Sequence, residues 1–230
     1  MTIIRRSFTR PDPEIVAAVG KYSTATIHEA QGRLGAVDSA IKPIKPDVHV
    51  FGTAITAQCH IGDNLMIFEA INCAQPGDIL VLSAGNNPQQ GGFGDVLASA
   101  CMGRGIKALI IDAGVRDGRG LRKSGFPVFC LGLSIKGTSK ETLGSVNQPV
   151  VIGGELISPG DIVVADDDGR DAQAPAQFAH RIVLNADLQS FGRVDAGPAA
   201  GGDDALVVAD RPFDVECGFL AEDRNARVGH

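Results

Sequence analysis

The sequence predicts a layered α/β domain, and three observations lead to this fold class. Short apolar segments typical of buried strands alternate along the chain with segments that have helical apolar spacing. Hydrophobic residues make up 44% and charged residues 21% of the 230 residues, which is ordinary for a packed globular protein. The 29 glycines and 12 prolines indicate many tight turns between short elements.

The first elements follow from helix capping and apolar spacing. Asp12-Pro13-Glu14 has the residue types that begin a helix, and Gly20 is typical of its end. A second helix is predicted over residues 24–33, ended by Gly35. The alternating, β-branched stretch 50–57 predicts a strand.

The middle of the chain continues this alternation. Gly62-Asp63-Asn64 is expected to cap a helix over residues 65–71. Another helix is expected to begin at Gly94-Asp95 and to reach about Arg104. Buried strands are predicted over residues 78–82, 107–112 and 126–131.

One turn-and-strand pattern occurs twice. Residues 76–81 read Pro-Gly-Asp-Ile-Leu-Val, and residues 159–164 read Pro-Gly-Asp-Ile-Val-Val. Pro-Gly favours a turn, and in both copies the aspartate leads a buried strand. Because the flanking residues do not repeat, we interpret the pattern as a reused local device and not as a domain duplication.

Composition divides the chain after Asp166-Asp167-Asp168-Gly169. Residues 1–169 are predicted to form the α/β domain, and residues 170–230 a divergent tail whose structure the sequence does not predict. Residues 197–204 have the composition of a flexible loop. The apolar runs at 181–184 and 205–208 are too short to make an independent core.

Charge and composition argue against several classes of function. A net charge of −6 disfavours a nucleic-acid or membrane partner, and the absence of tryptophan disfavours a base-stacking platform. No apolar run has the length of a signal peptide or a membrane span. The five cysteines are scattered without a CxxC pair, which indicates neither a zinc site nor a disulfide framework, and a reducing cytoplasm is the expected location. Three of them are expected to be small buried apolar residues: Cys59, Cys101 and Cys130.

Several short patterns resemble nucleotide-binding or metal-binding motifs but do not match them. Gly92-Phe93-Gly94 begins like a dinucleotide fingerprint, but Leu97 stands in place of the closing glycine. Residues 132–137 have the glycine spacing of a P-loop, but Thr138 replaces the phosphate-binding lysine. Three histidines have no metal-ligand spacing and are interpreted as satisfied surface or core residues: His28, His60 and His180.

Two neighbouring segments carry the candidate chemistry. The glycine-rich residues 91–97 lead into a helix whose first backbone N–H groups can bind a carboxylate or phosphate. One strand later, Arg116 offers a planar fork for a carboxylate, and Asp117 offers a hard oxygen ligand for Mg²⁺ or Mn²⁺. The same residues could also be an ordinary helix start and a surface salt bridge, and spacing alone leaves both interpretations open.

From Asp95 to Arg116-Asp117 the spacing is D-x20-R-D. With further blocks in the same order, this resembles the family of 4-hydroxy-4-methyl-2-oxoglutarate and 4-carboxy-4-hydroxy-2-oxoadipate aldolases, which is grouped with the proteins called regulator of ribonuclease activity A. The resemblance covers about residues 12–169. The further blocks are residues 26–33, 62–64, 93–95, 111–117, 125–129, 142–147 and 164–169.

The resemblance implies a swivelling-type α/β sandwich that assembles as trimers or dimers of trimers, with active sites near the subunit boundaries. It also implies a retro-aldol cleavage, dependent on Mg²⁺ or Mn²⁺, that releases pyruvate from a branched 4-hydroxy-2-oxo acid, with oxaloacetate decarboxylation as a side activity. Arg116 would then hold the pyruvyl carboxylate or enolate, and Asp117 would ligate the metal directly or through water. The substrate-binding residues implied at the loop and helix start are Gly94, Asp95, Val96 and Leu97, together with Arg116.

Some roles stay open at this point. Asp95 would either transfer protons or only cap the helix, and Asp63 and Asn64 would either recognise the distal part of the substrate or cap theirs. No lysine lies beside the glycine loop or the Arg-Asp turn, which agrees with a metal-stabilised enolate and not with a Schiff base. The alternative function is a non-catalytic, ribonuclease-binding regulator of the same fold, and a third possibility is an inactive relative.

The chain departs from the family after Gly169. The expected valine-rich strand and long charged helix are not recognisable there, and no glutamate lies between Glu155 and Glu216. Relatives can place a glutamate from that helix near a neighbouring subunit's metal. A change of reading frame near Gly169, or divergence of the tail, would account for the departure and would affect subunit packing and activity.

Overall fold

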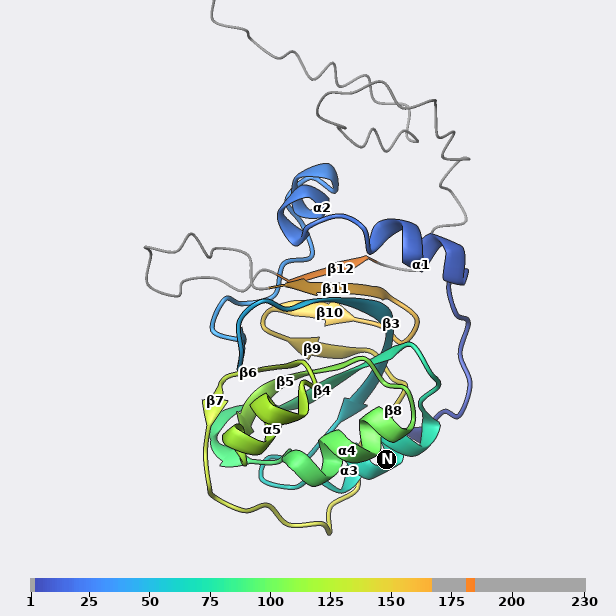
Figure 1. The fold of residues 1–230 in the computed structure, drawn as a ribbon. Helices are drawn as coiled ribbons and strands as arrows, with labels where there is room; N and C mark the ends of the chain where they lie inside the picture. The colour runs from blue at the N-terminus through green and yellow to red at the C-terminus, as the bar shows by residue number, and fades with distance from the viewer. Residues whose placement is uncertain (1–2, 167–180, 185–230) are drawn as a thin grey trace, which may run out of the picture. The chain divides into compact units, whose positions relative to one another are not determined.

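The computed structural model describes residues 3–166 and 181–184 (Figure 1). Its strands are β1 (Ile3–Ile4), β2 (Lys42–Pro43), β3 (His49–Gln58), β4 (Asp78–Gly91), β5 (Ala108–Val115), β6 (Val128–Cys130), β7 (Gly132–Leu133), β8 (Ser145–Val146), β9 (Val150–Ile152), β10 (Glu155–Ile157), β11 (Ile162–Asp166) and β12 (Arg181–Leu184). Its helices are α1 (Pro13–Val19), α2 (Thr24–Ala30), α3 (Leu65–Cys73), α4 (Asp95–Gly103) and α5 (Gly118–Ser124). The predicted α/β class is therefore confirmed.

The main sheet has the strand order β1-β8-β3-β4-β5-β6-β2, with β11 also pairing with β3, β12 with β11 and β7 with β5. The neighbours β3, β4, β5 and β6 run parallel to one another. β9 and β10 form a separate antiparallel hairpin. Because β4 and β5 are parallel neighbours, the segments that follow them leave the sheet at the same edge.

Two apolar cores lie on the two faces of the parallel strands. Along β5, Leu109 and Ile111 belong to the core that includes the buried residues of α3, α4 and α5, and Figure 1 shows these helices gathered on one side of the sheet. Ala108 and Ile110 belong to the other core, which includes the β9–β10 hairpin. This alternation is the strand period of two, and burial on both faces explains the continuous apolar runs in the sequence.

The helix boundaries agree in part with the predictions. α1 begins as expected, because the Asp12 carboxylate accepts a hydrogen bond from the Glu14 N–H at 2.8 Å, and Gly20 is its C-cap. α2 ends at Ala30, earlier than the predicted residue 33. The reason is that Gly32 and Arg33 adopt left-handed φ values of 74° and 64°, which an α-helix does not accommodate.

β4 is longer than the predicted strand 78–82. Beyond Leu82 its pairing with β5 continues only with register shifts at Asn87 and Gly91. Gly85 and Asn86 have φ values of 81° and 53°, so the strand bends there. We call residues 85–90 the β4 curl; it leads directly into the glycine-rich loop.

The repeated Pro-Gly-Asp pattern is the same turn in both places. Asp78 and Asp161 each accept a hydrogen bond from the backbone N–H three residues earlier, in both cases at 2.8 Å. Gly77 and Gly160 take matching φ values of 94° and 97°. The interpretation as a reused turn-and-strand device is therefore confirmed.

One strand of the described structure comes from the predicted tail. Residues 181–184 form β12, which pairs antiparallel with β11. The remaining expectations for residues 170–180 and 185–230, including the loop at 197–204 and the roles of His180 and Cys217, lie outside the described residues. Within the described part, no helix has both the length and the apolar character needed to cross a membrane.

Candidate active site

The glycine-rich loop after β4 and the turn after β5 are joined by backbone hydrogen bonds. The Arg116 N–H donates to the Phe93 carbonyl at 2.8 Å, and the Gly92 N–H donates to the Gly114 carbonyl at 3.3 Å. The Phe93 side chain is fully buried and stacks near Phe126, so the loop is anchored in the core beneath the helices. The two segments singled out in the sequence therefore lie side by side at one edge of the sheet.

Gly94 is packed directly against the Arg-Asp pair. A Cβ atom at Gly94 would collide with Asp117 Oδ2 and would lie 3.2 Å from Arg116 Cγ. The Gly94 φ of −148° is ordinary extended backbone, so the need for glycine here is one of space. Asp117 has a left-handed φ of 56°, a conformation that is uncommon outside glycine and concentrates at functional sites.

The first turn of α4 faces the same edge with backbone N–H groups that have no partner in the part of the chain that the structure describes. Gly94 is the N-cap and offers no side-chain cap, and the first intrahelical bond runs from the Ala98 N–H to the Gly94 carbonyl. The N–H groups of the first turn are consequently available, as the sequence predicts for a helix start. Val96 is 75% exposed, whereas the Leu97 side chain is buried in the core.

Asp95 lies at the contact between α4 and α5. A Cβ at Gly120 would lie 2.8 Å from Asp95 Oδ2, so this carboxylate rests against the first turns of α5. It is exposed to solvent, and among the described residues it accepts no hydrogen bond. It is therefore not engaged in capping α4.

Arg116 and Asp117 form a loose pair. Arg116 Nε lies 3.4 Å from Asp117 Oδ2, and the two side chains are 51% and 42% exposed. Asp117 is the N-cap of α5 but makes no side-chain cap hydrogen bond. An exposed pair of this kind contributes little to stability, so the planar end of the arginine and the carboxylate both stay available to a ligand.

Asp63 has a structural role that the sequence showed only in part. Its Oδ1 accepts from the Leu65 N–H at 2.8 Å, as expected for a residue that begins α3. Its Oδ2 accepts from the Ser139 hydroxyl and from the N–H groups of Glu141 and Thr142, at 2.8, 2.7 and 2.9 Å. Burial alone raises the pKa of this carboxyl, but these four donors outweigh burial and hold its pKa below the ordinary value.

The three distant donors belong to residues 134–144, which we call the strap. The strap runs from β7 to β8, and its other anchor is at the β4 curl, where the Ser134 hydroxyl donates to the Gln89 carbonyl at 2.6 Å. The Gly91 N–H donates to the Lys136 carbonyl at 2.9 Å. The strap thus crosses beside the glycine loop, and no local sequence signal indicated its partners.

Asn64 holds the glycine loop and does not cap α3. Its Nδ2 donates to the Gly92 carbonyl at 2.9 Å, and it makes no cap hydrogen bond. Asn64 is 7% exposed, and its Oδ1 has no hydrogen-bond partner among the described residues. Of the two roles left open for this residue, helix capping is not the one seen.

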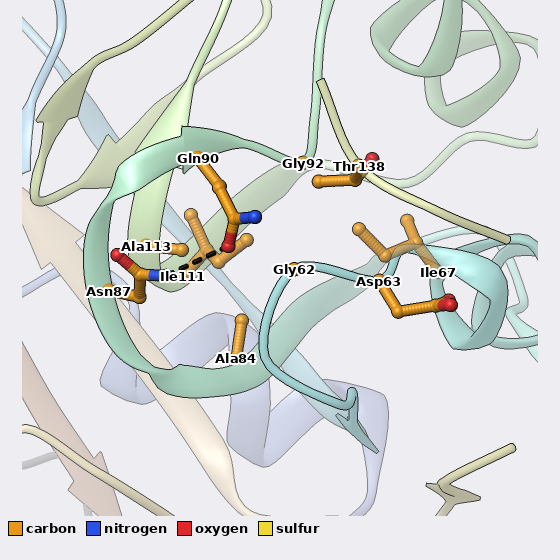
Figure 2. Close-up of a pocket in the computed structure, with 10 residues that line it drawn as sticks. All are labelled: Gly62, Asp63, Ile67, Ala84, Asn87, Gln90, Gly92, Ile111, Ala113 and Thr138. Carbon is orange, nitrogen blue, oxygen red and sulfur yellow. Dashed lines mark hydrogen bonds between the residues drawn. The ribbon is translucent and has the colours of Figure 1, made fainter. Parts of the chain in front are cut away.

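A small hollow, with a volume of about 10 Å³, opens on the Gly92 side of the loop (Figure 2). We call it the Gln90 hollow, after the carboxamide that projects into it from the β4 curl. Its lining residues are Gly62, Asp63, Ile67, Ala84, Asn87, Gln90, Gly92, Ile111, Ala113 and Thr138. Neither the curl nor this hollow was predicted from the sequence.

The remaining titratable groups lie in the core or on the outer surface. Burial raises the pKa of Cys59 and of Cys101 to about 12, and that of Cys130 to about 11, so these thiols are the small buried residues that were predicted. Burial also raises the pKa of Asp112, although the Ala84 N–H donates to it. His28 and His60 bond to nearby carbonyl oxygens, in agreement with satisfied surface histidines.

The chain is similar to a known protein family and to several of its members. The family model "RraA-like: Aldolase/RraA" matches residues 24–170. A protein of Halalkalibacterium halodurans, provisionally named a 4-hydroxy-4-methyl-2-oxoglutarate aldolase, is 36% identical over 146 residues, which are 64% of this chain and 70% of that protein. A protein of Shewanella oneidensis with the same name is 31% identical over 121 residues, covering 52% of this chain and 72% of that protein.

Solved structures agree with the fold. The Streptomyces coelicolor protein RraAS2, described as an unusual member of the RNase ES inhibitor RraA family, superposes with a TM-score of 0.64 at 28% identity, covering 78% of this chain and 89% of that one. An RNA-processing inhibitor RraA from a Thermus species gives a TM-score of 0.61 at 21% identity, covering 71% and 92% of the two chains. From the family match over most of the described residues and from the shared fold, this chain belongs to the RraA-like family of aldolases and RraA proteins.

Proposed function

We propose that this chain is a divalent-metal-dependent aldolase that cleaves 4-hydroxy-4-methyl-2-oxoglutarate or 4-carboxy-4-hydroxy-2-oxoadipate and releases pyruvate. The observation that carries the proposal is the packing of Gly94, at the start of α4, directly against Arg116 and Asp117. This packing supports the proposal that the N–H groups of α4, the Arg116 guanidinium and the Asp117 carboxylate bind one ligand. A pyruvyl group, with a carboxylate beside a carbonyl oxygen, needs that combination.

The pyruvyl end of the substrate is bound by the backbone and by Arg116. The free N–H groups at the start of α4 and the positive end of its dipole attract the carboxylate. The guanidinium of Arg116 makes no hydrogen bond to another described residue, so it can engage the carboxylate or the developing enolate in a planar, two-point contact. These groups stabilise negative charge where it forms during cleavage.

Asp117 fits a divalent cation of the Mg²⁺ type. Mg²⁺ keeps several waters and is often held by only one or two carboxylates together with substrate oxygens. Asp117 offers one carboxylate with no cap hydrogen bond, and the described residues contain no group of three or more His, Cys, Asp or Glu suited to a metal. When bound, the cation supplies Lewis-acid polarisation of the substrate carbonyl.

Asp95 is the proposed group for proton transfer. Asp95 would take the 4-hydroxyl proton as the bond between C3 and C4 breaks, so that C4 becomes the carbonyl carbon of a departing second 2-oxo acid. The electron pair of the broken bond passes to C3 and the 2-oxo group. Proton return to C3 then gives pyruvate. The exposed Asp95 carboxylate, free of capping, is the acid-base group of α4 at this edge. The same binding of a 2-oxo acid supports oxaloacetate decarboxylation as a second activity.

The site is proposed to lie in a homotrimer or hexamer. Val96, Leu133 and Ile135 are 75%, 55% and 94% exposed, and they come from α4, β7 and the strap around the site. Exposed apolar side chains are stabilised when another copy of the chain buries them, and these exposures support the proposed assembly. Light scattering on the purified protein measures the oligomeric mass directly.

The proposal is tested by a coupled pyruvate assay over a panel of 2-oxo acids, with Mg²⁺, with Mn²⁺ and with EDTA. Pyruvate release is expected with either metal and is expected to stop with EDTA. Arg116→Ala and Asp117→Asn are expected to lower kcat/KM by at least about a hundred-fold, because each removes a charged contact to the reacting group. Arg119→Ala is the matched control, because it removes an exposed arginine of α5 two residues after Asp117. Arg119→Ala is expected to have wild-type rates. Pyruvate release that survives EDTA and both substitutions would refute the mechanism.

A regulatory role is the second candidate, and one observation favours it. The 28%-identical RraAS2 is described as belonging to an RNase ES inhibitor family, and it shares this fold. Such a role would need a binding surface for a ribonuclease and no pyruvate chemistry. Co-purification with a ribonuclease, in a preparation that releases no pyruvate from any member of the panel, would favour this candidate over the aldolase.

A further inference from the structure

Asp112 is a buried carboxylate that the proposed mechanism does not use. It lies near the end of β5, on the same strand that leads to Arg116, and it is 4% exposed. Burial raises the pKa of Asp112 although several donors surround its carboxylate, so the ionised form destabilises the fold. Buried groups with shifted pKa values cluster at functional sites. The contacts of this carboxylate show which part of the chain it holds.

The donors to Asp112 come from the bend at the start of the β4 curl. The backbone N–H groups of Ala84 and Asn86 donate to its carboxylate, and the Ser83 hydroxyl donates to its Oδ2 at 3.4 Å. Between the two N–H groups the chain turns at Gly85, whose φ is 81°, and Asn86 follows with a φ of 53°. A left-handed conformation is unfavourable for asparagine, and a carboxylate bonded on both sides of the bend stabilises it. Asp112 therefore fixes the direction in which the curl leaves the regular part of β4.

The far end of the curl is packed against β5 and Arg116. A Cβ at Gly91 would lie 2.9 Å from Arg116 Cβ and 3.2 Å from the Arg116 backbone nitrogen. A Cβ at Gly114 would lie 2.5 Å from the Pro88 carbonyl oxygen. The absence of side chains at both glycines lets the two backbones lie in direct contact. Because close-packed interiors transmit a displacement, a shift of the curl is expected to move Arg116.

The same contacts continue from the curl into the proposed active site. Gly91 leads into the glycine loop, where the Phe93 carbonyl accepts from the Arg116 N–H at 2.8 Å. Gly94 then lies against the side chains of Arg116 and Asp117. The bend, the curl, the glycine loop and the Arg-Asp pair are thus joined by an unbroken series of contacts.

We propose that Asp112 is a positioning residue of the aldolase, which sets the bend at Gly85 and Asn86 and, through the curl, the place of Arg116 and the glycine loop. The inference rests on the proposed aldolase function and adds a residue that touches neither the substrate nor the metal. An ionised Asp112 accepts from both backbone N–H groups. A neutral side chain of the same shape has one acceptor oxygen for them, so the bend loses a bond and the curl can shift.

Asp112→Asn is the test, because asparagine keeps the shape of the side chain and removes one acceptor oxygen. With Mg²⁺, kcat/KM for pyruvate release is expected to fall by roughly ten- to a hundred-fold, since small misplacements of orienting groups have effects of this size. Gly85→Ala is expected to give a similar loss by a second route, because alanine is strained at this φ and its Cβ would collide with Ile61. In both variants the amide hydrogens of residues 84–91 should exchange with deuterium faster than in wild type.

The pH dependence separates positioning from a purely structural role. The causes of the Asp112 pKa shift among the described residues are burial and hydrogen bonds, and Cys59, whose ionisation Asp112 disfavours, stays neutral because burial raises its pKa to about 12. The folded-state pKa of Asp112 is raised, so its stabilisation is present in acid and is lost as the pH rises. Asp112→Asn should therefore gain stability relative to wild type between about pH 4 and about pH 8. The ratio of wild-type to variant kcat/KM should instead grow over this range, because the ionised carboxylate holds the bend.

Asp161→Asn is the matched control. Asp161 is also a buried aspartate at a turn, where it accepts from the Ser158 N–H at 2.8 Å, but that turn precedes β11 and does not include the curl. It is expected to keep the wild-type kcat/KM, and thermal unfolding checks that each variant is folded. Wild-type kcat/KM in folded Asp112→Asn and Gly85→Ala, or an equal loss in Asp161→Asn, overturns this inference and leaves the aldolase intact. Absence of pyruvate from every member of the panel with the wild-type protein overturns the aldolase proposal and this inference with it.

Discussion

Replacing Asp63 with asparagine tests whether one buried carboxylate holds the strap. Asparagine keeps an oxygen that can accept from the Leu65 N–H, so the start of α3 stays capped. At the other position an NH₂ group replaces Oδ2 and faces the donors of Ser139, Glu141 and Thr142. The two backbone N–H groups then lose their acceptor, and the Ser139 hydroxyl must rotate to accept a bond in place of donating one.

The loss of unfolding free energy in Asp63→Asn follows from the number of hydrogen bonds that are lost. A hydrogen bond to a charged group contributes about 1.5 kcal/mol or more, so losing the two backbone bonds in Asp63→Asn is expected to destabilise the fold by about 3 kcal/mol. The donor residues are exposed, so water can replace part of the loss and much larger values are not expected. In a domain of this size about 3 kcal/mol lowers the thermal midpoint by about 6–12 °C. Thermal and urea unfolding followed by circular dichroism measure both quantities.

The stabilisation that Asp63 contributes is expected to depend on pH. The pKa of Asp63 is lowered in the folded state, so in acid the unfolded chain binds a proton more readily than the folded chain does. The stabilisation is therefore fully present above the ordinary aspartate pKa of about 3.9 and is lost as the pH falls below it. The difference between wild type and Asp63→Asn should be about 3 kcal/mol at pH 7 and should shrink below about pH 4. The raised pKa of Asp112 has the opposite sign, but it is common to both proteins and cancels in the difference.

Asp38→Asn is the matched control for this experiment. Asp38 is exposed, and its Oδ1 accepts from the Ala40 N–H at 2.8 Å, a bond that asparagine can also accept. It should change the stability by less than about 0.5 kcal/mol. A change of the same size in both variants, or a loss in Asp63→Asn that does not vary with pH, would refute the reasoning.

Three further predictions concern the site and the core. Gly94→Ala should lower pyruvate release by about a hundred-fold, because its Cβ displaces the Asp117 carboxylate, whereas Gly103→Ala, with open space around it, should have wild-type activity. Asp95→Asn should lower kcat at least about a hundred-fold and leave the unfolding midpoint within about 2 °C, as its carboxylate accepts no bond from the described residues. Iodoacetamide at pH 8 should label three thiols only after denaturation, as mass spectrometry would show: Cys59, Cys101 and Cys130.

Much of the fold could be predicted because its central strands are buried on both faces. Such strands are continuous apolar runs, as at residues 107–112, and they stand out against the glycine and proline turns. The β4 curl could not be found this way. Its residues are polar and include Pro88, which a sequence pattern assigns to a loop, and the strand is kept in the sheet only by irregular pairing with β5. The short strands β7 and β8 are too brief to have a period.

The part of the candidate site that comes from segments close together in the sequence could be predicted. A helix start and the end of the next parallel strand must share one edge of the sheet, so the spacing D-x20-R-D is enough to assign both segments to one place. No comparable rule of local sequence predicts the Gln90 hollow. Its wall comes from α3, β4, β5 and the strap, and only the folded chain brings these together.

The sequence does not distinguish the roles of the two aspartates in the Gly-Asp pairs at helix starts. Asp63 and Asp95 each follow a glycine near a helix start, Asp63 two residues before α3 and Asp95 as the first residue of α4. Capping rules favour an aspartate near either start and do not tell which of the two has another role. The fold separates them: Asp63 is 4% exposed with four donors around it, whereas Asp95 is exposed and has none among the described residues. What distinguishes the two is the strap, whose donors lie 76 to 79 residues from Asp63 along the chain. A carboxylate already saturated by donors is suited to holding a fold, and one left without them is suited to exchanging a proton. The distant partners of Asp63 therefore support the proposal that Asp95, and not Asp63, transfers protons.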